Sequence, residues 1–215
     1  REFLAIMMRN AEKLSSLIDN LLDFSKLYHG SEELVLTPFD VVDCIQASLE
    51  TVKPVADGRG ITLLLTVQDE ENASVKEPVL VNGDKGKLGQ VFNNLLSNAV
   101  KFNDNGGTVT VTVNLHKTEV TFSVTDTGIG IPKEAQDKIF NRFYQYDSSS
   151  SRRYPGTRIG LSIAQDIVRL HGGRISVFSR ERQGATFRFT LPLYKRLESA
   201  EVEQESPPIL PETRL

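Results

Sequence analysis

Two asparagines and a lysine stand at helical spacing in the middle of the chain. The segment NNLLSNAVKF covers residues 93–102, and within it Asn94 and Asn98 are four residues apart, with Lys101 three residues further on. Residues at this spacing share one face of a helix. Amide oxygens are hard ligands that suit Mg²⁺, and a lysine ammonium neutralises phosphate charge. The pattern therefore indicates a metal and phosphate site, although an ordinary polar helix face has the same pattern.

An aspartate followed by two glycines forms the second motif. Asp126 comes directly after a strand-like segment, and Gly128, Gly130 and Ile131 follow it. A carboxylate at a strand end can accept a hydrogen bond from the exocyclic amine of adenine. Glycines let the backbone approach a ligand closely and adopt positive φ. On its own this motif is weak, because many turns share it.

The third motif is a glycine-containing segment that leads into a helix. Residues 155–161 read PGTRIGL, and a helical pattern starts at Ile159. Backbone N–H groups at a helix start bind anions such as nucleotide phosphates. The segment is not a P-loop, because the Gly-Lys-Ser/Thr run is missing, and it does not fit the dinucleotide fingerprint either.

The elements that must position these motifs alternate along the chain. Apolar periodicity predicts helices over residues 41–55, 86–102 and 159–170. Alternating patterns predict strands over residues 61–67, 79–81, 108–115, 120–125, 174–179 and 186–191, with residues 31–38 as a polar connector. Strands that follow one another after helices favour an α+β fold. We expect a two-layer sandwich, in which helices cover a mixed, mostly antiparallel sheet.

Both ends of the chain differ from this middle part. Apolar residues in alternating steps of three and four predict a long stalk helix that needs a partner helix, and they are Leu4, Met7, Ala11, Leu14, Ile18 and Leu21. The last residues are acidic and contain three prolines, a composition typical of disorder. We therefore expect a stalk helix over residues 1–30, a globular domain over 31–195 and a disordered tail over 196–215.

Charge and composition exclude several classes of protein. The 25 Lys and Arg residues against 28 Asp and Glu give a net charge of −3, which offers no overall field for nucleic acid. The single cysteine, Cys44, cannot form an internal disulfide. No apolar run approaches the ~20 residues that span a bilayer. We expect a cytoplasmic chain without nucleic-acid or membrane contact, and this leaves a membrane anchor in a longer parent protein open.

Taken in order, the motifs resemble the N, G1, F and G2 boxes of sensor histidine kinases. They are NLLSNAVKF at 94–102, DTGIGI at 126–131, IFNRFY at 139–144 and GTRIGLSI at 156–163. LHGG at 170–173 and GATF at 184–187 extend the resemblance, which covers about residues 32–193. The stalk-like segment resembles the second helix of the family's dimerisation domain. Four ordered motifs at the family's spacing are specific.

The resemblance implies a protein-histidine kinase that uses ATP and Mg²⁺ and passes the phosphoryl group to a response regulator. It implies that Asn94 is catalytic and, with Asn98, faces Mg²⁺ and the phosphates, and that Asp126 meets the adenine amine. It also implies a parent that dimerises through its stalk helices and a mobile ATP lid over residues 139–160. The implied nucleotide-binding residues are Asn94, Asn98, Lys101, Phe102, Asp126, Gly128, Gly130, Ile131, Gly156, Thr157, Arg158, Gly160, Leu161 and Thr186.

The sequence departs from the family pattern in two respects. The phospho-accepting histidine of the stalk is missing, and we expect His29, His116 and His171 all to be non-catalytic, so the chain would not autophosphorylate at the usual site. Arg158 replaces the middle glycine of the G2 box, and Gln145 stands where an arginine often follows Phe-Tyr. Arg158 either blocks the backbone nest or supplies the charge that Gln145 does not.

Three alternatives remain at this point. A degenerate nucleotide-sensing or dimerisation module without kinase activity is favoured by Arg158. A hydrolase of the same ATPase superfamily would use a glutamate as base where Asn94 stands, so it is disfavoured. A serine kinase of the anti-sigma type would lack the stalk helix.

Overall fold

The computed structural model describes residues 7, 34–69, 78–142, 144 and 159–194. Met7 is helical, whereas the rest of the predicted stalk helix, residues 145–158 of the expected lid and the tail from residue 195 lie outside the described residues. The described helices are α2 (Val41–Asp57), α3 (Lys85–Lys101), α4 (Lys133–Gln136) and α5 (Gly160–Leu170). The strands are β1 (Thr37–Asp40), β2 (Thr62–Asp69), β3 (Leu80–Gly83), β4 (Thr108–Leu115), β5 (Glu119–Asp126), β6 (Arg174–Ser179) and β7 (Ala185–Pro192).

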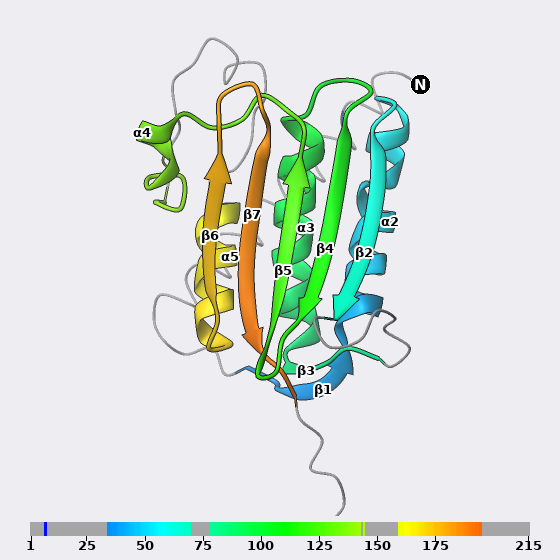
Figure 1. The fold of residues 1–215 in the computed structure, drawn as a ribbon, viewed down its shortest axis with the longest axis vertical. Coiled ribbons are helices and arrows are strands. Elements are labelled where there is room, and N and C mark those ends of the chain that lie inside the picture. Colours follow the sequence, from blue (N-terminus) through cyan, green and yellow to red (C-terminus); the bar gives the residue numbers. More distant parts are fainter. Residues whose placement is uncertain (1–6, 8–33, 70–77, 143, 145–158, 195–215) are drawn as a thin grey trace, which may run out of the picture.

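Five strands form one sheet in the order β2-β4-β5-β7-β6. Strand β2 runs parallel to β4, and the other neighbours are antiparallel. Helices α2, α3 and α5 lie together on one face of this sheet (Figure 1). The predicted α+β sandwich with a mixed, mostly antiparallel sheet is therefore confirmed.

The core lies between the sheet and α3. The helix buries an apolar stripe that consists of Leu88, Val91, Phe92, Leu95, Leu96, Ala99 and Val100. The ring of Phe92 lies 5.6 Å from that of Phe122 on β5 and 5.4 Å from that of Phe189 on β7, between ring centroids. Each such side chain contributes about 1.5–3 kcal/mol when it leaves water. This packing fixes α3, and the asparagines on it, against the centre of the sheet.

The opposite face of the sheet carries hydroxyl groups. Along β5, Phe122 and Val124 point toward the helices, so Ser123 and Thr125 between them point away. On β7 the same alternation turns Phe189 toward the core and Arg188 outward. One face of an antiparallel sheet is commonly polar in this way, while the other packs against helices.

His171 joins two helices at the other end of the molecule. Its Nε2 accepts a hydrogen bond from the backbone N–H of Asp84 at 2.9 Å, and its Nδ1 lies 2.8 Å from the carbonyl oxygen of Ile167. Because Nε2 is an acceptor here, the proton of the neutral ring belongs on Nδ1, which donates to Ile167. Asp84 is also the N-cap of α3 and accepts from the N–H of Lys87. The expected non-catalytic role of His171 agrees with these bonds.

Two elements differ from the sequence-based expectation. Residues 37 and 38 were expected at the end of a polar connector, but residues 37–40 form β1, which pairs with β3. Asp40 is at the same time the N-cap of α2, where its side chain accepts a hydrogen bond from the N–H of Val42 at 3.0 Å. Pro38 is tolerated because this two-stranded pairing leaves edge positions that need no N–H donor. Helix α4 was not predicted, since its single turn carries no readable period. Among the described helices, none is long and apolar enough to cross a membrane.

Candidate functional site

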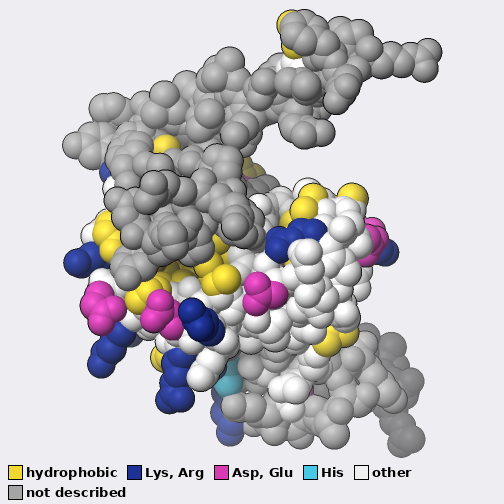
Figure 2. Space-filling view, turned by 90° about the horizontal axis from the view of Figure 1, so that it is seen from above, with side chains coloured by type: hydrophobic (Ala, Val, Ile, Leu, Met, Phe, Trp, Pro, Cys, Tyr) yellow, Lys and Arg dark blue, Asp and Glu magenta, His cyan; other side chains and the backbone are white. Residues whose placement is uncertain are grey.

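The chemistry-bearing motifs meet at one end of the sheet, where β5 ends and the β6–β7 turn lies (top of Figure 1). Asp126 is the last residue of β5, and α3 ends beside it with Lys101. Seen from this end, Lys, Arg, Asp and Glu side chains stand around hydrophobic ones (Figure 2).

Asp126 is a buried carboxylate with one oxygen in use. Its Oδ1 accepts hydrogen bonds from the N–H of Gly128 at 2.9 Å and of Ala185 at 3.3 Å. Oδ2 accepts none from the described residues. Burial raises the pKa of Asp126 above its ordinary value, and the two N–H donors oppose that rise. The carboxyl is therefore oriented by the backbone, with its second oxygen available to an external donor.

The turn after Asp126 packs directly on the end of α3. The N–H of Ile129 donates to the carbonyl oxygen of Phe102 at 3.1 Å. A methyl group placed on Gly128 would lie 2.2 Å from that same oxygen and 2.7 Å from the Cα of Asn103. Because both of these atoms belong to the backbone, the turn reaches this position only with glycine.

The β6–β7 turn holds the same segment from the other side. The N–H of Gly184 donates to the carbonyl oxygen of Gly128 at 2.9 Å, and the N–H of Arg182 donates to that of Ile129 at 2.6 Å. Gly130 has φ +67°, and a methyl group on it would lie 2.0 Å from the carbonyl oxygen of Arg180. The expected close approach at Gly128 and Gly130 is thus made to protein backbone, which sets the shape of the turn.

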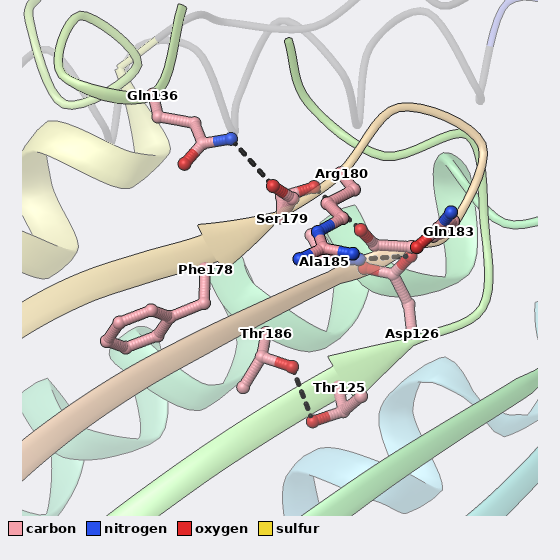
Figure 3. Close-up of a pocket in the computed structure, with 10 residues that line it drawn as sticks. Thr125, Asp126, Gln136, Phe178, Ser179, Arg180, Gln183, Ala185 and Thr186 are labelled. Atoms are coloured by element: carbon pink, nitrogen blue, oxygen red, sulfur yellow. Dashed lines mark hydrogen bonds between the residues drawn. The ribbon is translucent and has the colours of Figure 1, made fainter. Parts of the chain in front are cut away.

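Ile131 ends the turn and is held through its backbone. Its N–H donates to Ser179 Oγ at 2.8 Å, and its carbonyl oxygen accepts from Gln136 Nε2 at 2.9 Å. The same Gln136 amide also donates to the carbonyl oxygen of Ser179 at 2.9 Å (Figure 3). Helix α4 is anchored to the sheet in this way. Neither Ser179 nor Gln136 was singled out from the sequence.

Asn103 is buried below the turn and is hydrogen-bonded to Thr127, which is exposed. Asn103 is 2% exposed, and its Nδ2 donates to the carbonyl oxygen of Thr108 at 3.0 Å. The hydroxyl of Thr127 donates to Asn103 Oδ1 at 3.2 Å and accepts from the N–H of Thr108 at 2.9 Å. The position of Asn103, directly after the asparagine helix, is the only sequence signal that could have indicated it.

Asn94, which belongs to α3, lies beside the start of α5, and its side-chain amide has an unsatisfied donor among the described residues. Asn94, Asn98 and Lys101 are all half-buried on α3. A methyl group on Gly160, the first residue of α5, would lie 2.9 Å from Asn94 Oδ1. The Nδ2 of Asn94 is buried and finds no hydrogen-bond partner among the described residues. The structure thus brings the first and third motifs together, because Asn94 lies beside Gly160. Leu161, the next residue of the third motif, is the second residue of α5.

The other predicted residues are placed as follows. Phe102 is half-buried, and the Lys101 ammonium lies 4.9 Å from the centroid of its ring. Gly156, Thr157 and Arg158, together with Gln145, lie outside the described residues.

Thr186 lies on the opposite face of the sheet from Asp126. Its hydroxyl is 3.0 Å from that of Thr125, with which it is paired across β5 and β7 (Figure 3). Since Thr125 and Asp126 are neighbours on one strand, their side chains point to opposite faces. Thr186 and Phe178 line an open pocket of about 410 Å³, to which Asp126 and Ala185 also contribute. Ala185, the neighbour of Thr186, donates its N–H to the Asp126 carboxylate, and a role of Thr186 at a nucleotide stays a prediction.

No cluster of His, Cys, Asp and Glu side chains large enough to hold a metal ion occurs within the described ranges. The side-chain oxygen that the structure places beside α5 is the amide oxygen of Asn94, and an amide by itself binds a cation weakly. Mg²⁺ commonly keeps several waters and takes the rest of its ligands from substrate phosphates. This donor set therefore fits a Mg²⁺ that arrives with a nucleotide.

Fold and site together define an ATP-binding catalytic domain of the kind found in histidine kinases of two-component systems. The family model described as "Histidine kinase-, DNA gyrase B-, and HSP90-like ATPase" matches residues 83–195, and the chain belongs to this family. Residue 94 is asparagine and not the glutamate that a hydrolase of the same superfamily would use as its base, which disfavours the hydrolase alternative.

The chain is similar to several histidine kinases. The circadian input-output histidine kinase CikA from Synechococcus elongatus is 36% identical over 201 residues, which are 94% of this chain and 26% of CikA. The crystal structure of full-length ShkA in complex with AMPPNP is 30% identical, with a TM-score of 0.77 over 91% of this chain and 39% of ShkA. The catalytic domain of the histidine kinase ThkA is 28% identical, with a TM-score of 0.62 over 74% of this chain and 95% of that domain. The chain thus spans about a quarter of the length of CikA.

Proposed function

We propose that this domain binds ATP with Mg²⁺ and transfers the γ-phosphoryl group to a histidine of its parent protein, for relay to an aspartate of a response regulator. The observation that carries the proposal is the buried Nδ2 of Asn94 beside the first turn of α5, which has no hydrogen-bond partner among the residues that the structure describes. A buried donor without a partner costs about 1–3 kcal/mol. A phosphate oxygen at the start of α5 would satisfy it and would also meet the helix N–H groups.

The two ends of the nucleotide would be recognised by different elements. Oδ2 of Asp126 would accept from the adenine amine, because Oδ1 is already held by Gly128 and Ala185. Lys101 would neutralise phosphate charge. The amide oxygens of Asn94 and Asn98 would face Mg²⁺, which when bound spreads the charge of the phosphates.

The reaction would depend mainly on positioning. An imidazole nitrogen forms a bond to the γ-phosphorus while the bond from that phosphorus to the β-phosphate oxygen breaks, and ADP leaves. Such phosphoryl transfers need in-line alignment and stabilisation of charge on the transferred group. Asn94 would hold the attacking imidazole, and Lys101 would remain close to the phosphates.

The acceptor histidine would come from another part of the parent protein. Both ring nitrogens of His171 are engaged, and His116 Nε2 lies 3.0 Å from the hydroxyl of Thr121. The third histidine, His29, lies outside the described residues. We expect the parent to dimerise through stalk helices such as residues 1–30 and to act in the cytoplasm, where it meets a receiver domain.

Nucleotide titration tests the binding step. We would titrate the chain with ADP and AMPPNP, with and without Mg²⁺, beside Asp126→Asn. Glu119→Gln, at the far end of the same strand, is the matched control. We expect Mg²⁺-dependent binding that Asp126→Asn abolishes and Glu119→Gln retains. Equal binding by the Asp126→Asn variant would contradict the assignment.

Phosphoryl transfer is tested separately. The chain is mixed with γ-labelled ATP and a segment of the parent that contains its dimerisation histidine. We expect acid-labile label on that histidine, and none with Asn94→Ala. Tight nucleotide binding without any transfer would instead support the nucleotide-sensing module that Arg158 suggests.

A further inference from the structure

Arg59 comes two residues after the end of α2, and its side chain reaches across to the end of α3. Its Nη1 donates to the carbonyl oxygens of Val100 at 2.5 Å and Lys101 at 3.2 Å. Its Nη2 donates to the carbonyl oxygen of Asn103 at 2.6 Å, and its Nε donates to Asn105 Oδ1 at 3.0 Å. All of the nitrogens of one guanidinium are therefore used on a single segment that begins 41 residues further along the chain.

The atoms that Arg59 contacts are those that a helix end leaves without partners. The last four carbonyl oxygens of a helix have no N–H donor within it, and this end carries the negative pole of the helix dipole. The carbonyl oxygen of Asn98 accepts a hydrogen bond from the N–H of Phe102. The carbonyl oxygens of Val100 and Lys101 accept from the guanidinium of Arg59, whose positive charge is favourable at this pole.

The backbone around Arg59 is joined to the same loop. The N–H of Gly106 donates to the carbonyl oxygen of Arg59 at 3.0 Å, and the N–H of Thr62 donates to that of Gly107 at 2.9 Å. The loop between α3 and β4 is thus fixed by both the main chain and the side chain of this corner.

From this loop, contacts lead directly to the Asp126 turn. Phe102 accepts from the N–H of Ile129, and Asn103 accepts from the hydroxyl of Thr127. Arg59 donates to the carbonyl oxygen of Asn103 itself, and Phe102 lies between Asn103 and Lys101, whose carbonyl oxygen also accepts from Arg59. A shift at the end of α3 would therefore move Lys101 and the turn relative to Asp126.

We propose that Arg59 is a positioning residue of the nucleotide site. Its hydrogen bonds fix the position of the end of α3. They thereby fix the spacing between Lys101 and the turn that orients Asp126. The inference rests on the proposed function, because it assigns both ends of that spacing to one nucleotide. If Arg59 had a purely structural role, its substitution would lower the free energy of unfolding without a specific effect on nucleotide affinity.

The test compares Arg59→Met with a variant of matched stability. Val113→Ala removes buried methyl groups from β4 without touching this network. ADP affinity is measured at a temperature where both variants are fully folded. We expect Arg59→Met to weaken ADP binding about tenfold or more, as sub-ångström to ångström misplacement does, whereas Val113→Ala binds like the unmodified chain. Arg59→Lys, which keeps the charge but has fewer donors, should restore part of the affinity.

A second readout follows the network itself. Hydrogen exchange of the Ile129 amide should speed up in Arg59→Met and stay unchanged in Val113→Ala, because only the former loosens Phe102. If Arg59→Met does not fold, Arg59→Lys and Asn105→Ala carry the same comparison.

The outcomes separate the two proposals. ADP binding by Arg59→Met as tight as that of the unmodified chain, or an equal loss in Val113→Ala, would overturn the role of Arg59 and leave the proposed function intact. An unmodified chain that does not bind ADP would reject the proposed function, and the role of Arg59 with it.

Discussion

The carbonyl oxygen of Phe102 accepts a hydrogen bond from the N–H of Ile129 at 3.1 Å, and this bond joins the end of α3 to the turn after β5. The acceptor follows α3, which contains Asn98 and Lys101, and the donor belongs to the turn that follows Asp126. Residues expected at opposite ends of a nucleotide are thus held together by main-chain atoms. Because main-chain atoms make this bond, a substitution disturbs it mainly where an added side chain would clash, as at Gly128.

Gly128→Ala should break this joint. The added methyl group would lie 2.2 Å from the carbonyl oxygen of Phe102, which cannot move without pulling on α3. We expect a loss of about 1–3 kcal/mol in the free energy of unfolding, as overpacking typically costs, together with loss of ADP binding. Urea unfolding and nucleotide titration measure the two effects.

Gly89→Ala is the control for this substitution. Its methyl group would lie 3.7 Å from Cys44 Sγ, which is an ordinary contact, and the residue lies inside α3. Replacing a helical glycine by alanine stabilises by up to about 1 kcal/mol. The interpretation of Gly128 would be wrong if both alanine variants were as stable as the unmodified chain and bound ADP equally.

Asp126→Asn should change how stability depends on pH. Because the folded-state pKa of Asp126 is raised, the folded chain holds its proton more tightly than the unfolded chain does. The related stability is present below the unfolded pKa of about 3.9 and is lost as pH rises through the folded value. Asp126→Asn has no such loss, so its free energy of unfolding should gain on that of the unmodified chain between acidic and neutral pH. Urea unfolding at a series of pH values checks this, and parallel curves would reject it.

The fold was predictable where the buried pattern is local. Helices α3 and α5 and the β4–β5 hairpin were predicted within one or two residues, since each presents its own apolar period to the core. Strand β1 was missed because its four residues are ordered by pairing with β3, at least 40 residues away. Periodicity contains no information about such a partner.

Candidate site residues could be proposed from the sequence where ligand chemistry is local to a motif. Asn94, Asp126 and Gly128 were proposed because their residue types and spacing suit phosphate, adenine and a tight turn. Thr186 was assigned through the family resemblance alone, and strand alternation puts its neighbour Ala185 on the side of Asp126. Arg59 could not be found in this way, because its partners follow it by at least 41 residues.

His171 should be a stability residue and not a site residue. Its ring satisfies the N–H of Asp84 and the carbonyl oxygen of Ile167, and both would lose their partner in His171→Ala. We expect a loss of about 1–3 kcal/mol for the buried groups left unpaired. ADP affinity at low temperature should stay unchanged, because Asp84 begins α3 whereas Lys101 ends it. His116→Ala is the control, with a smaller loss, and thermal unfolding measures both. A variant that stayed fully stable yet lost ADP binding would assign His171 to the site.

Gly160→Ala should separate binding from transfer. The added methyl group would lie 2.9 Å from Asn94 Oδ1, and unlike the contact at Gly128 this one meets the end of a side chain. The Asn94 amide can rotate away, so the stability should change little, while the group that we propose to orient the imidazole is displaced. We expect ADP binding to be largely kept and the rate of label transfer to fall by about tenfold or more, as misplaced positioning groups do. Initial rates beside those of Gly89→Ala measure this. Transfer at the unmodified rate would show that Asn94 does not need its present orientation, and it would remove the link between α5 and the reacting phosphoryl group.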